Sequence, residues 1–222
     1  MPSLTVENYV KTIYLIAHRR GESAGAVGTG ELAAALGVSP GSVTGMLKTL
    51  SEADLASYTP YGGAVLTAAG TRLALAVIRR HRLLELFLAR TLDLPWDEVH
   101  EEAEHMEHAV SERLIDRIDR FLEFPSFDPH GDPIPRADGS IAEPAGAPLV
   151  DLERGGRFRI IRVVDQEPAF LRYLTECGLD LGVEGTLLEN RAEAGALVVL
   201  VRDQTIALGF DAARKMLVER RR

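Results

Sequence analysis

The chain has almost no cysteine and no long apolar run. Cys177 is the only cysteine among 222 residues, which excludes an internal disulfide and a thiolate-rich metal cluster. No apolar run approaches the roughly 18 residues that a membrane-spanning helix needs, and without a charged, apolar, small-residue leader at the start we expect no signal peptide. With 46% hydrophobic and 26% charged residues, the composition is that of a globular protein, which we expect in the cytoplasm, away from membranes.

Basic charge is also scarce, since the net charge is -8, and proteins that bind nucleic acid usually present basic surface. The charge is unevenly distributed. Residues 1–90 carry nine Lys and Arg against six Asp and Glu, whereas residues 91–123 carry three against eleven. The acidity is therefore concentrated in one segment, where bound divalent cations would offset it.

Histidine and glutamate crowd together within that acidic segment, at residues 99–108. On one helix, His100, Glu104, Glu107 and His108 would share a face, which is typical of a metal site; a solvated acidic face is the alternative. His100 and His108 would stand roughly 12 Å apart along that helix, too far for one ion to bind both. The spacing therefore predicts two metal sites.

The first 70 residues have the element order of a winged helix-turn-helix. Gly37 is expected to end one helix, Ser39 to cap the next and Pro40 to occupy its first position, while Thr29 is expected to cap the earlier helix. Such pieces are common individually, but their order within so short a stretch favours DNA binding. The predicted helices are 4–18, 29–36 and 40–54, followed by a hairpin of strands 55–59 and 64–67.

In a winged helix the third helix enters the major groove with its N-terminal residues near the base edges. No arginine lies at the start of this helix to contact guanine, so we expect the DNA sequence to be read through hydroxyl and methyl contacts and through DNA shape. Lys48 and the tip of the wing would contact phosphates. The predicted DNA-binding residues are Ser39, Pro40, Ser42, Thr44, Lys48 and Tyr61.

A long helix over residues 68–90 carries His81 and Glu85 at i and i+4, so both can reach one ion; a surface ion pair is the alternative. Neighbouring arginines are expected to form a basic flank. Further helices beginning at Pro95 and after Ser111 carry more Leu and Phe than a small winged domain can cover. These helices predict a dimer interface.

The second half of the chain changes character. Residues 124–150 are rich in Pro, Gly and Asp, as linkers are, and the segments beyond them alternate as strands of a small barrel. The barrel is expected from strands 157–164, 185–190, 196–201 and 205–210 and a short helix at 168–177. The predicted fold is mainly α with small β parts: a winged helix-turn-helix (1–72), a helical metal-binding and dimerisation domain (73–135), a linker (136–150) and an SH3-like barrel (151–222).

Three stretches, 78–85, 99–108 and the Pro-His-Gly-Asp-Pro-Ile-Pro motif at 129–135, follow the winged helix in this chain. Together they resemble the diphtheria toxin repressor family of metal-dependent regulators, in particular its manganese-responsive branch with a C-terminal SH3-like domain. The resemblance implies a homodimeric repressor of metal-uptake genes that binds palindromic operator DNA. It also implies two Mn²⁺ ions per subunit as corepressor, with Fe²⁺ as the alternative.

The resemblance also implies the metal ligands. Glu104 replaces a cysteine of iron-responsive members, so the donors become oxygen and nitrogen, which suits Mn(II) and also Fe(II). Asn8 and Lys11 stand where manganese-responsive members have acidic residues, and Glu7 is the alternative to Asn8. The implied primary site is Glu104, Glu107, His108 and Asn8; the ancillary site is His81, Glu85 and His100, with Gln166 or Glu167.

A metal-dependent enzyme is the alternative to a DNA-binding regulator, and two sequence motifs would indicate one. The chain has no His-Glu-x-x-His or His-x-x-Glu-His motif of a metal hydrolase. A di-iron bundle needs Glu-x-x-His on two helices, and within the cluster only Glu102 and His105 have that spacing. We therefore expect a protein that is not an enzyme and has no small-molecule substrate.

Overall fold

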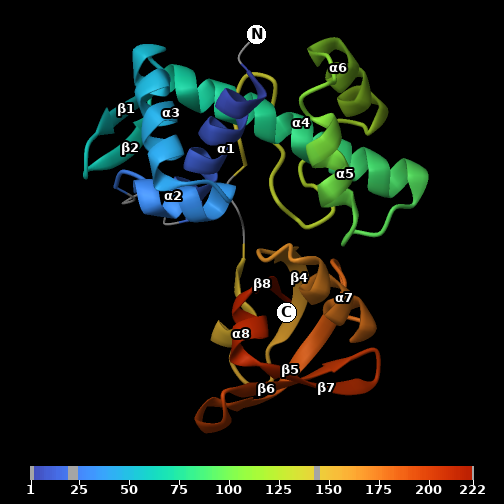
Figure 1. Ribbon diagram of the computed structural model, residues 1–222. Coiled ribbons are helices and arrows are strands. Elements are labelled where there is room, and N and C mark those ends of the chain that lie inside the picture. Colours follow the sequence, from blue (N-terminus) through green and yellow to red (C-terminus); the bar gives the residue numbers. More distant parts are fainter. Residues whose placement is uncertain (1–2, 20–24, 143–145, 222) are drawn as a thin grey trace. The chain divides into compact units, whose positions relative to one another are not determined.

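The computed structural model describes residues 3–19, 25–142 and 146–221 (Figure 1). The chain divides into two compact units. The first unit is Met1–Arg80 together with Pro135–Ser140, and the second is His81–Ile134 together with Ile141–Arg222. Helix α4 begins in the first unit and ends in the second.

The first unit has the predicted order of three helices and a hairpin. Apolar residues at helical spacing form one core, which includes Val10, Ile13, Leu32, Leu47 and Leu50. Its elements are α1 (Leu4–Arg19), α2 (Thr29–Leu36), α3 (Pro40–Glu52), β1 (Ala56–Thr59) and β2 (Gly63–Leu66).

Local chemistry sets the turn between α2 and α3. Gly37 ends α2 in the left-handed conformation at φ 65°, which glycine adopts without strain. The Ser39 hydroxyl accepts a hydrogen bond from the Ser42 amide at 3.2 Å, and Pro40 occupies the first turn. Thr29 is not an N-cap: Gly28 occupies that position, with no side-chain hydrogen bond, and Thr29 is the first helical residue.

The hairpin β1–β2 is the wing of this unit. Its antiparallel register runs from Ala56 opposite Leu66 to Thr59 opposite Gly63. A Cβ atom at Gly63 would lie 2.6 Å from the carbonyl oxygen of Val27, so only glycine lets these backbones approach.

Helix α4 (Ala68–Leu92) carries three arginines that the sequence pattern placed on a basic flank. That expectation is wrong, because Arg79, Arg80 and Arg82 are all buried. Arg80 donates to Glu7 at 2.8 Å, and the Arg82 Nε lies 3.6 Å from a carboxylate oxygen of Asp128. Paired guanidinium groups can be enclosed in this way, whereas unpaired ones stay in solvent.

In the second unit the end of α4 packs with α5 (Val99–Met106) and α6 (Glu112–Phe121). Ser111 caps α6 as predicted, accepting from the Leu114 amide at 3.3 Å. Pro95 does not open α5, because the backbone first turns over the next residues and the helix begins at Val99.

The segment that follows α6 resembles a linker in composition, but its first part is buried. Asp128, His130 and Asp132 are buried within the second unit. A Cβ atom at Gly131 would lie 2.1 Å from the Ile161 carbonyl oxygen, so the loop lies directly against strand β4 (Arg157–Val163). Residues 143–145 of the expected linker lie outside the described residues.

The C-terminal part of the second unit is a six-stranded sheet in the order β3-β8-β4-β5-β6-β7, with antiparallel pairings throughout. The four expected strands form, and β3 and β8 join them in the sheet. Phe158, Ile160, Leu187 and Leu197 are among its core residues. The remaining elements are β3 (Ala147–Pro148), η1 (Leu149–Asp151), α7 (Pro168–Glu176), β5 (Glu184–Arg191), η2 (Ala192–Ala194), β6 (Ala196–Val201), β7 (Gln204–Gly209), α8 (Phe210–Arg214) and β8 (Met216–Arg221).

Candidate metal centre and DNA-binding surface

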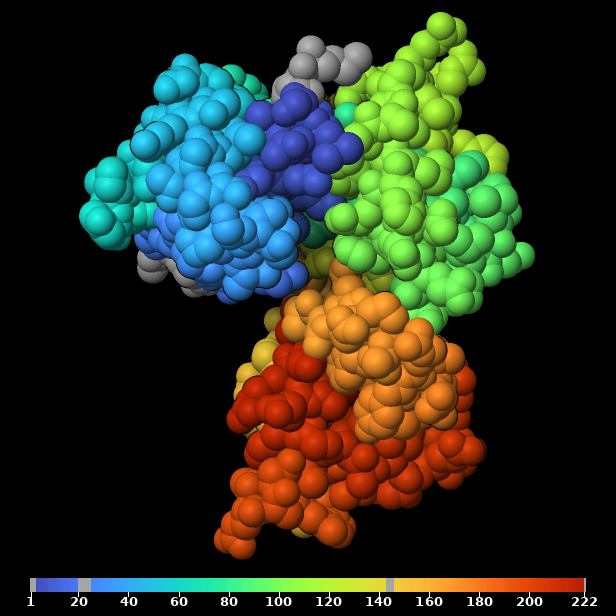
Figure 2. All heavy atoms as spheres, viewed as in Figure 1, coloured from blue at the N-terminus to red at the C-terminus, as the bar shows by residue number. Residues whose placement is uncertain are grey.

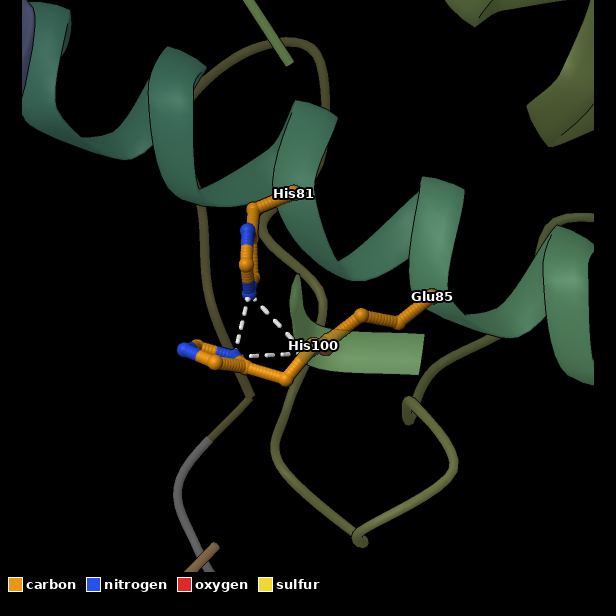
Figure 3. A group of neighbouring side chains, drawn as sticks. All are labelled: His81, Glu85 and His100. Carbon is orange, nitrogen blue, oxygen red and sulfur yellow. Dashed lines mark hydrogen bonds and ion pairs between the residues drawn. The ribbon is translucent and has the colours of Figure 1, made fainter. Parts of the chain in front are cut away.

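Helices α4 and α5 bring three predicted ligands together. His81 and Glu85 lie one turn apart on α4, both buried, with the His81 Nε2 atom 2.9 Å from a Glu85 oxygen. From α5, the His100 Nδ1 atom lies 3.1 Å from Glu85 and 3.1 Å from the His81 Nε2 (Figure 3). These three donors lie within 4.8 Å of one another, close enough for one small cation.

A second group of donors uses the other nitrogen of His81. The His81 Nδ1 atom lies 2.7 Å from an oxygen of Glu107, which is fully buried, and Glu104 can join both within 4.8 Å. His108 Nε2 lies 3.2 Å from the second Glu107 oxygen. Through its two ring nitrogens, His81 is thus common to groups that the sequence assigned to separate sites.

The shared helical face expected of this segment is only partly present. Helix α5 ends at Met106, so Glu107 and His108 lie in the turn that follows. The estimate of 12 Å between His100 and His108, which assumed an unbroken helix, therefore does not apply.

A third group of donors was missed from the sequence: Glu85 with Asp128 and His130, all buried. His130 Nε2–H donates to the Trp96 carbonyl at 2.7 Å, which in the neutral ring leaves a lone pair on Nδ1. Nδ1 has no hydrogen-bond partner among the described residues, and it lies 3.9 Å from Glu85 and 4.0 Å from Asp128. A buried lone pair facing two carboxylates needs a proton or a cation between them.

The pKa values of the two carboxyl groups in this third group are shifted in opposite directions. Burial raises the pKa of Asp128 well above its ordinary value, and the charges of Glu85 and Asp132 act the same way. Burial also acts to raise the pKa of Glu85, but the His81 charge and hydrogen bonds from His100 and His81 outweigh it, so this pKa is lowered.

The loop that carries Asp128 and His130 is fixed from both sides. One Asp128 oxygen accepts from the backbone amides of His130 and Asp132, at 2.8 and 2.9 Å. From the barrel, Arg162 pairs with Asp132, and the Gln166 amide donates to Asp132 at 2.8 Å. Gln166 therefore contacts this loop.

Glu167, the other predicted barrel ligand, lies elsewhere. It is exposed at the N-terminus of α7 and belongs to none of the His, Asp and Glu groups within the described residues. The ligand roles of Gln166 and Glu167 stay predictions.

The residues present fit a hard divalent cation. Every donor in the three groups is an imidazole nitrogen or a carboxylate oxygen, the set that suits Mn(II) and Fe(II). The orphaned Nδ1 atom of buried His130 is the clearest sign, because it lacks a hydrogen-bond partner among the described residues.

The first helix was expected to add a ligand from Asn8 or Glu7. The Glu7 carboxylate accepts from Arg80 at 2.8 Å within the first unit, and both side chains are buried. This pairing favours Asn8, which is half-buried on α1, although its role as a ligand stays a prediction.

The predicted DNA-binding residues lie on α3 and the wing, which form part of the surface of the first unit (Figure 2). Ser39, Ser42 and Lys48 are exposed and Thr44 is half-buried. Tyr61, at the tip of the wing, is fully exposed with φ 63°. A groove of about 700 Å³ runs between helix and wing, lined by Thr44, Lys48 and Tyr61 among others.

Three family models match successive parts of the chain. The DNA-binding domain of iron-dependent repressors matches residues 1–64, their metal-binding and dimerisation domain matches 67–136, and the FeoA domain matches 147–220. A solved manganese-dependent transcriptional repressor in complex with manganese is 39% identical, with a TM-score of 0.86 over 97% of this chain and 99% of its own. The chain belongs to the iron-dependent repressor family.

Two further proteins are similar to this chain. The regulator MntR of Geobacillus kaustophilus is 32% identical over 124 residues, which are 56% of this chain and 84% of MntR. The structure of ScaR with bound Zn²⁺ is 31% identical, with a TM-score of 0.79 over 98% of this chain and 99% of that one.

Family membership confirms the predicted fold class and the prediction that the protein is a transcriptional regulator and not an enzyme. Among the described residues, no helix combines the length and apolar character needed to cross a membrane.

Proposed function

We propose that this protein is a transcriptional repressor that binds palindromic operator DNA as a homodimer, with Mn(II) as corepressor and Fe(II) as the alternative metal. It acts in the cytoplasm, and its targets are genes for metal uptake. One observation carries the proposal: a single unbroken helix, α4, begins directly after the wing and then carries His81 and Glu85. The wing of the DNA-binding domain thus leads directly into the helix that carries two metal ligands.

The donor set supports two ions per subunit. His81 presents its two nitrogens to different carboxylates, Glu85 and Glu107, and Glu85 in turn faces His130. We assign Glu104, Glu107, His108 and Asn8, with His81, to one ion. The other ion would be held by Glu85 with His100 or with His130 and Asp128.

The bound metal would supply positive charge that offsets the crowded carboxylates. The chain's own residues do the rest: Glu85 and His81 hold α4, while His100 and Glu107 hold α5 and the turn after it. Fixing these ligands in one arrangement lowers the entropy that the metal-free protein would lose on binding DNA. Paired recognition helices then read two half-sites about one helical turn apart.

The test is DNA affinity at fixed ionic strength, with the duplex selected from a random pool by the Mn(II)-loaded protein. We expect fluorescence anisotropy to give at least about tenfold tighter binding in Mn(II) than in chelator, a coupling of about 1.4 kcal/mol. Metal analysis of the loaded dimer should find two ions per subunit. Equal affinity in both conditions would refute the proposal.

A further inference from the structure

The second unit contains a hollow that lies apart from the DNA-reading surface and includes only Asp128 of the metal donors. It encloses about 580 Å³ and lies between the loop at 127–131 and strand β4 of the barrel, with Leu181 and Gly182 at one side. Pockets that bind small molecules are typically about 300 to 1,000 Å³. The hollow is thus large enough for a ligand of moderate size.

Arginine dominates the charge around this hollow. Arg90 and Arg159 line it, both exposed, and neither has an ion-pair partner among the described residues. Arg162 also lines it and pairs with Asp132, yet its Nε atom is buried without an acceptor in the described part of the chain. Three arginines therefore line one space, and Arg90 and Arg159 have no ion pair among the described residues.

The lining contains three arginines and two acidic residues, Glu219 and Asp128. Glu219 lies 3.7 Å from Arg221, which it shares with Glu184 at 3.3 Å, so the charge of Glu219 is offset only in part. Asp128 is buried, and one of its carboxylate oxygens lies 3.6 Å from the Nε atom of Arg82, outside the lining, which offsets its charge. The hollow is thus left with positive charge to be matched.

The walls between the arginines are apolar. Phe127 is 45% exposed, although it is a large aromatic residue, and Ile161 and Leu181 are half-buried beside it. Guanidinium groups bind carboxylate and phosphate through two parallel hydrogen bonds, and an exposed ring offers an apolar contact. The combination matches a ligand with an anionic head and an apolar body.

We propose that this hollow binds a small organic anion, whose carboxylate or phosphate group contacts Arg90, Arg159 and Arg162 and whose apolar body packs on Phe127. The ligand is bound between the helical part and the barrel of the second unit, against the loop that carries His130.

The test uses the full-length protein in chelator, with phenyl phosphate as probe and calorimetry as readout. We expect saturable binding that weakens at least about tenfold in Arg90→Gln and in Arg159→Gln, because each loses a charged donor pair. Arg220→Gln, exposed on β8 outside the hollow, is the matched control and should bind like the wild type. Benzyl alcohol, which has the ring without the charge, should not bind.

Benzoate in place of phenyl phosphate tells a carboxylate ligand from a phosphate ligand. Intermolecular nuclear Overhauser effects should join the probe ring to Phe127 and Ile161, a readout that requires no variant. The proposal is overturned by the absence of saturable binding, by equal affinity in Arg90→Gln, Arg159→Gln and wild type, by equal weakening in Arg220→Gln, or by contacts that lie elsewhere.

Discussion

At the scale of single residues, Asp128 and Glu85 are two buried carboxyl groups whose pKa values differ. Both are buried beside His130, and two ionised carboxylates so close together repel each other. The pKa of Asp128 is raised and that of Glu85 is lowered, so in the metal-free protein a proton shared by the pair favours Asp128. A ligand role requires this proton to leave, so metal binding by this group should strengthen as the pH rises.

Asp128→Asn tests that assignment through stability. A carboxyl whose folded pKa exceeds its unfolded value contributes stability at low pH, and this contribution is lost as the pH rises from the unfolded value towards the folded one. In chelator, the unfolding free energy of the wild type should therefore fall by up to about 1.4 kcal/mol per pH unit across this window. Denaturant unfolding between pH 4 and 8 should show this slope removed in Asp128→Asn and retained in the exposed control Asp151→Asn. Parallel curves for all three proteins would contradict the assignment.

Glu104→Cys tests the ligand chosen for metal preference. A thiolate is softer than a carboxylate, so the variant should favour Zn(II) over Mn(II) by about tenfold or more relative to the wild type. Competition between the two metals for the chelator-stripped protein measures this ratio. Glu102→Cys, which is exposed on the same helix outside the donor groups, should leave the ratio unchanged. If the two variants behave alike, Glu104 does not select the metal.

Some of these candidate metal ligands could be predicted from the sequence and others could not, because only some are brought together by local structure. His81 and Glu85 could be predicted because i to i+4 spacing on a helix places two side chains together without tertiary information. Asp128 and His130 could not, because their loop is positioned by Arg82 and by strand β4, far away in the sequence. The isolated histidine in a Pro, Gly and Asp segment was the available signal.

At the scale of elements, α3 and α6 begin with the same kind of capping hydrogen bond, but only the cap of α3 lies on the predicted DNA-reading surface. Ser39 accepts from the third residue of α3, and Ser111 does the same for α6. Replacing either serine by alanine should lower the unfolding free energy by about 1 kcal/mol. Only Ser39→Ala should also weaken DNA binding measured at fixed salt and Mn(II), because Ser39 lies on the predicted DNA-reading surface. Equal DNA affinity in both variants would remove Ser39 from that surface.

Element boundaries were predictable where local chemistry sets them. Gly37, Ser39 and Pro40 mark the turn before α3 by their own conformational preferences, and the structure has it there. The end of α5 at Met106 and the strand β8 were not foreseen. Strand β8 pairs with β4 from about sixty residues earlier, a contact that no local pattern carries.

At the scale of the whole molecule, the second unit leaves an apolar face exposed. Phe121, at the end of α6, packs edge to face with Phe87 of α4 at 6.1 Å, yet Phe121 remains 65% exposed. Leu92, Leu114 and Phe124 are exposed apolar residues on or beside the same helices. Exposed apolar surface of this kind marks contact with another protein, and the matched domain model of the family is one of dimerisation. We propose that the homodimer contact includes these exposed side chains.

Phe121→Ser tests this placement and separates it from metal binding. Aromatic residues at the centre of an interface cost about 2 kcal/mol or more when truncated, so the dimer dissociation constant should rise at least about tenfold in sedimentation experiments. Because a palindrome is read by two copies, the variant should lose affinity for the full operator in Mn(II) while binding an isolated half-site as the wild type does. Tyr173→Ser, which removes an exposed ring from α7 of the barrel, should change neither quantity. A dimer that persists in Phe121→Ser would place the interface elsewhere, whereas loss of half-site binding as well would mean that the substitution damages the subunit and not its pairing.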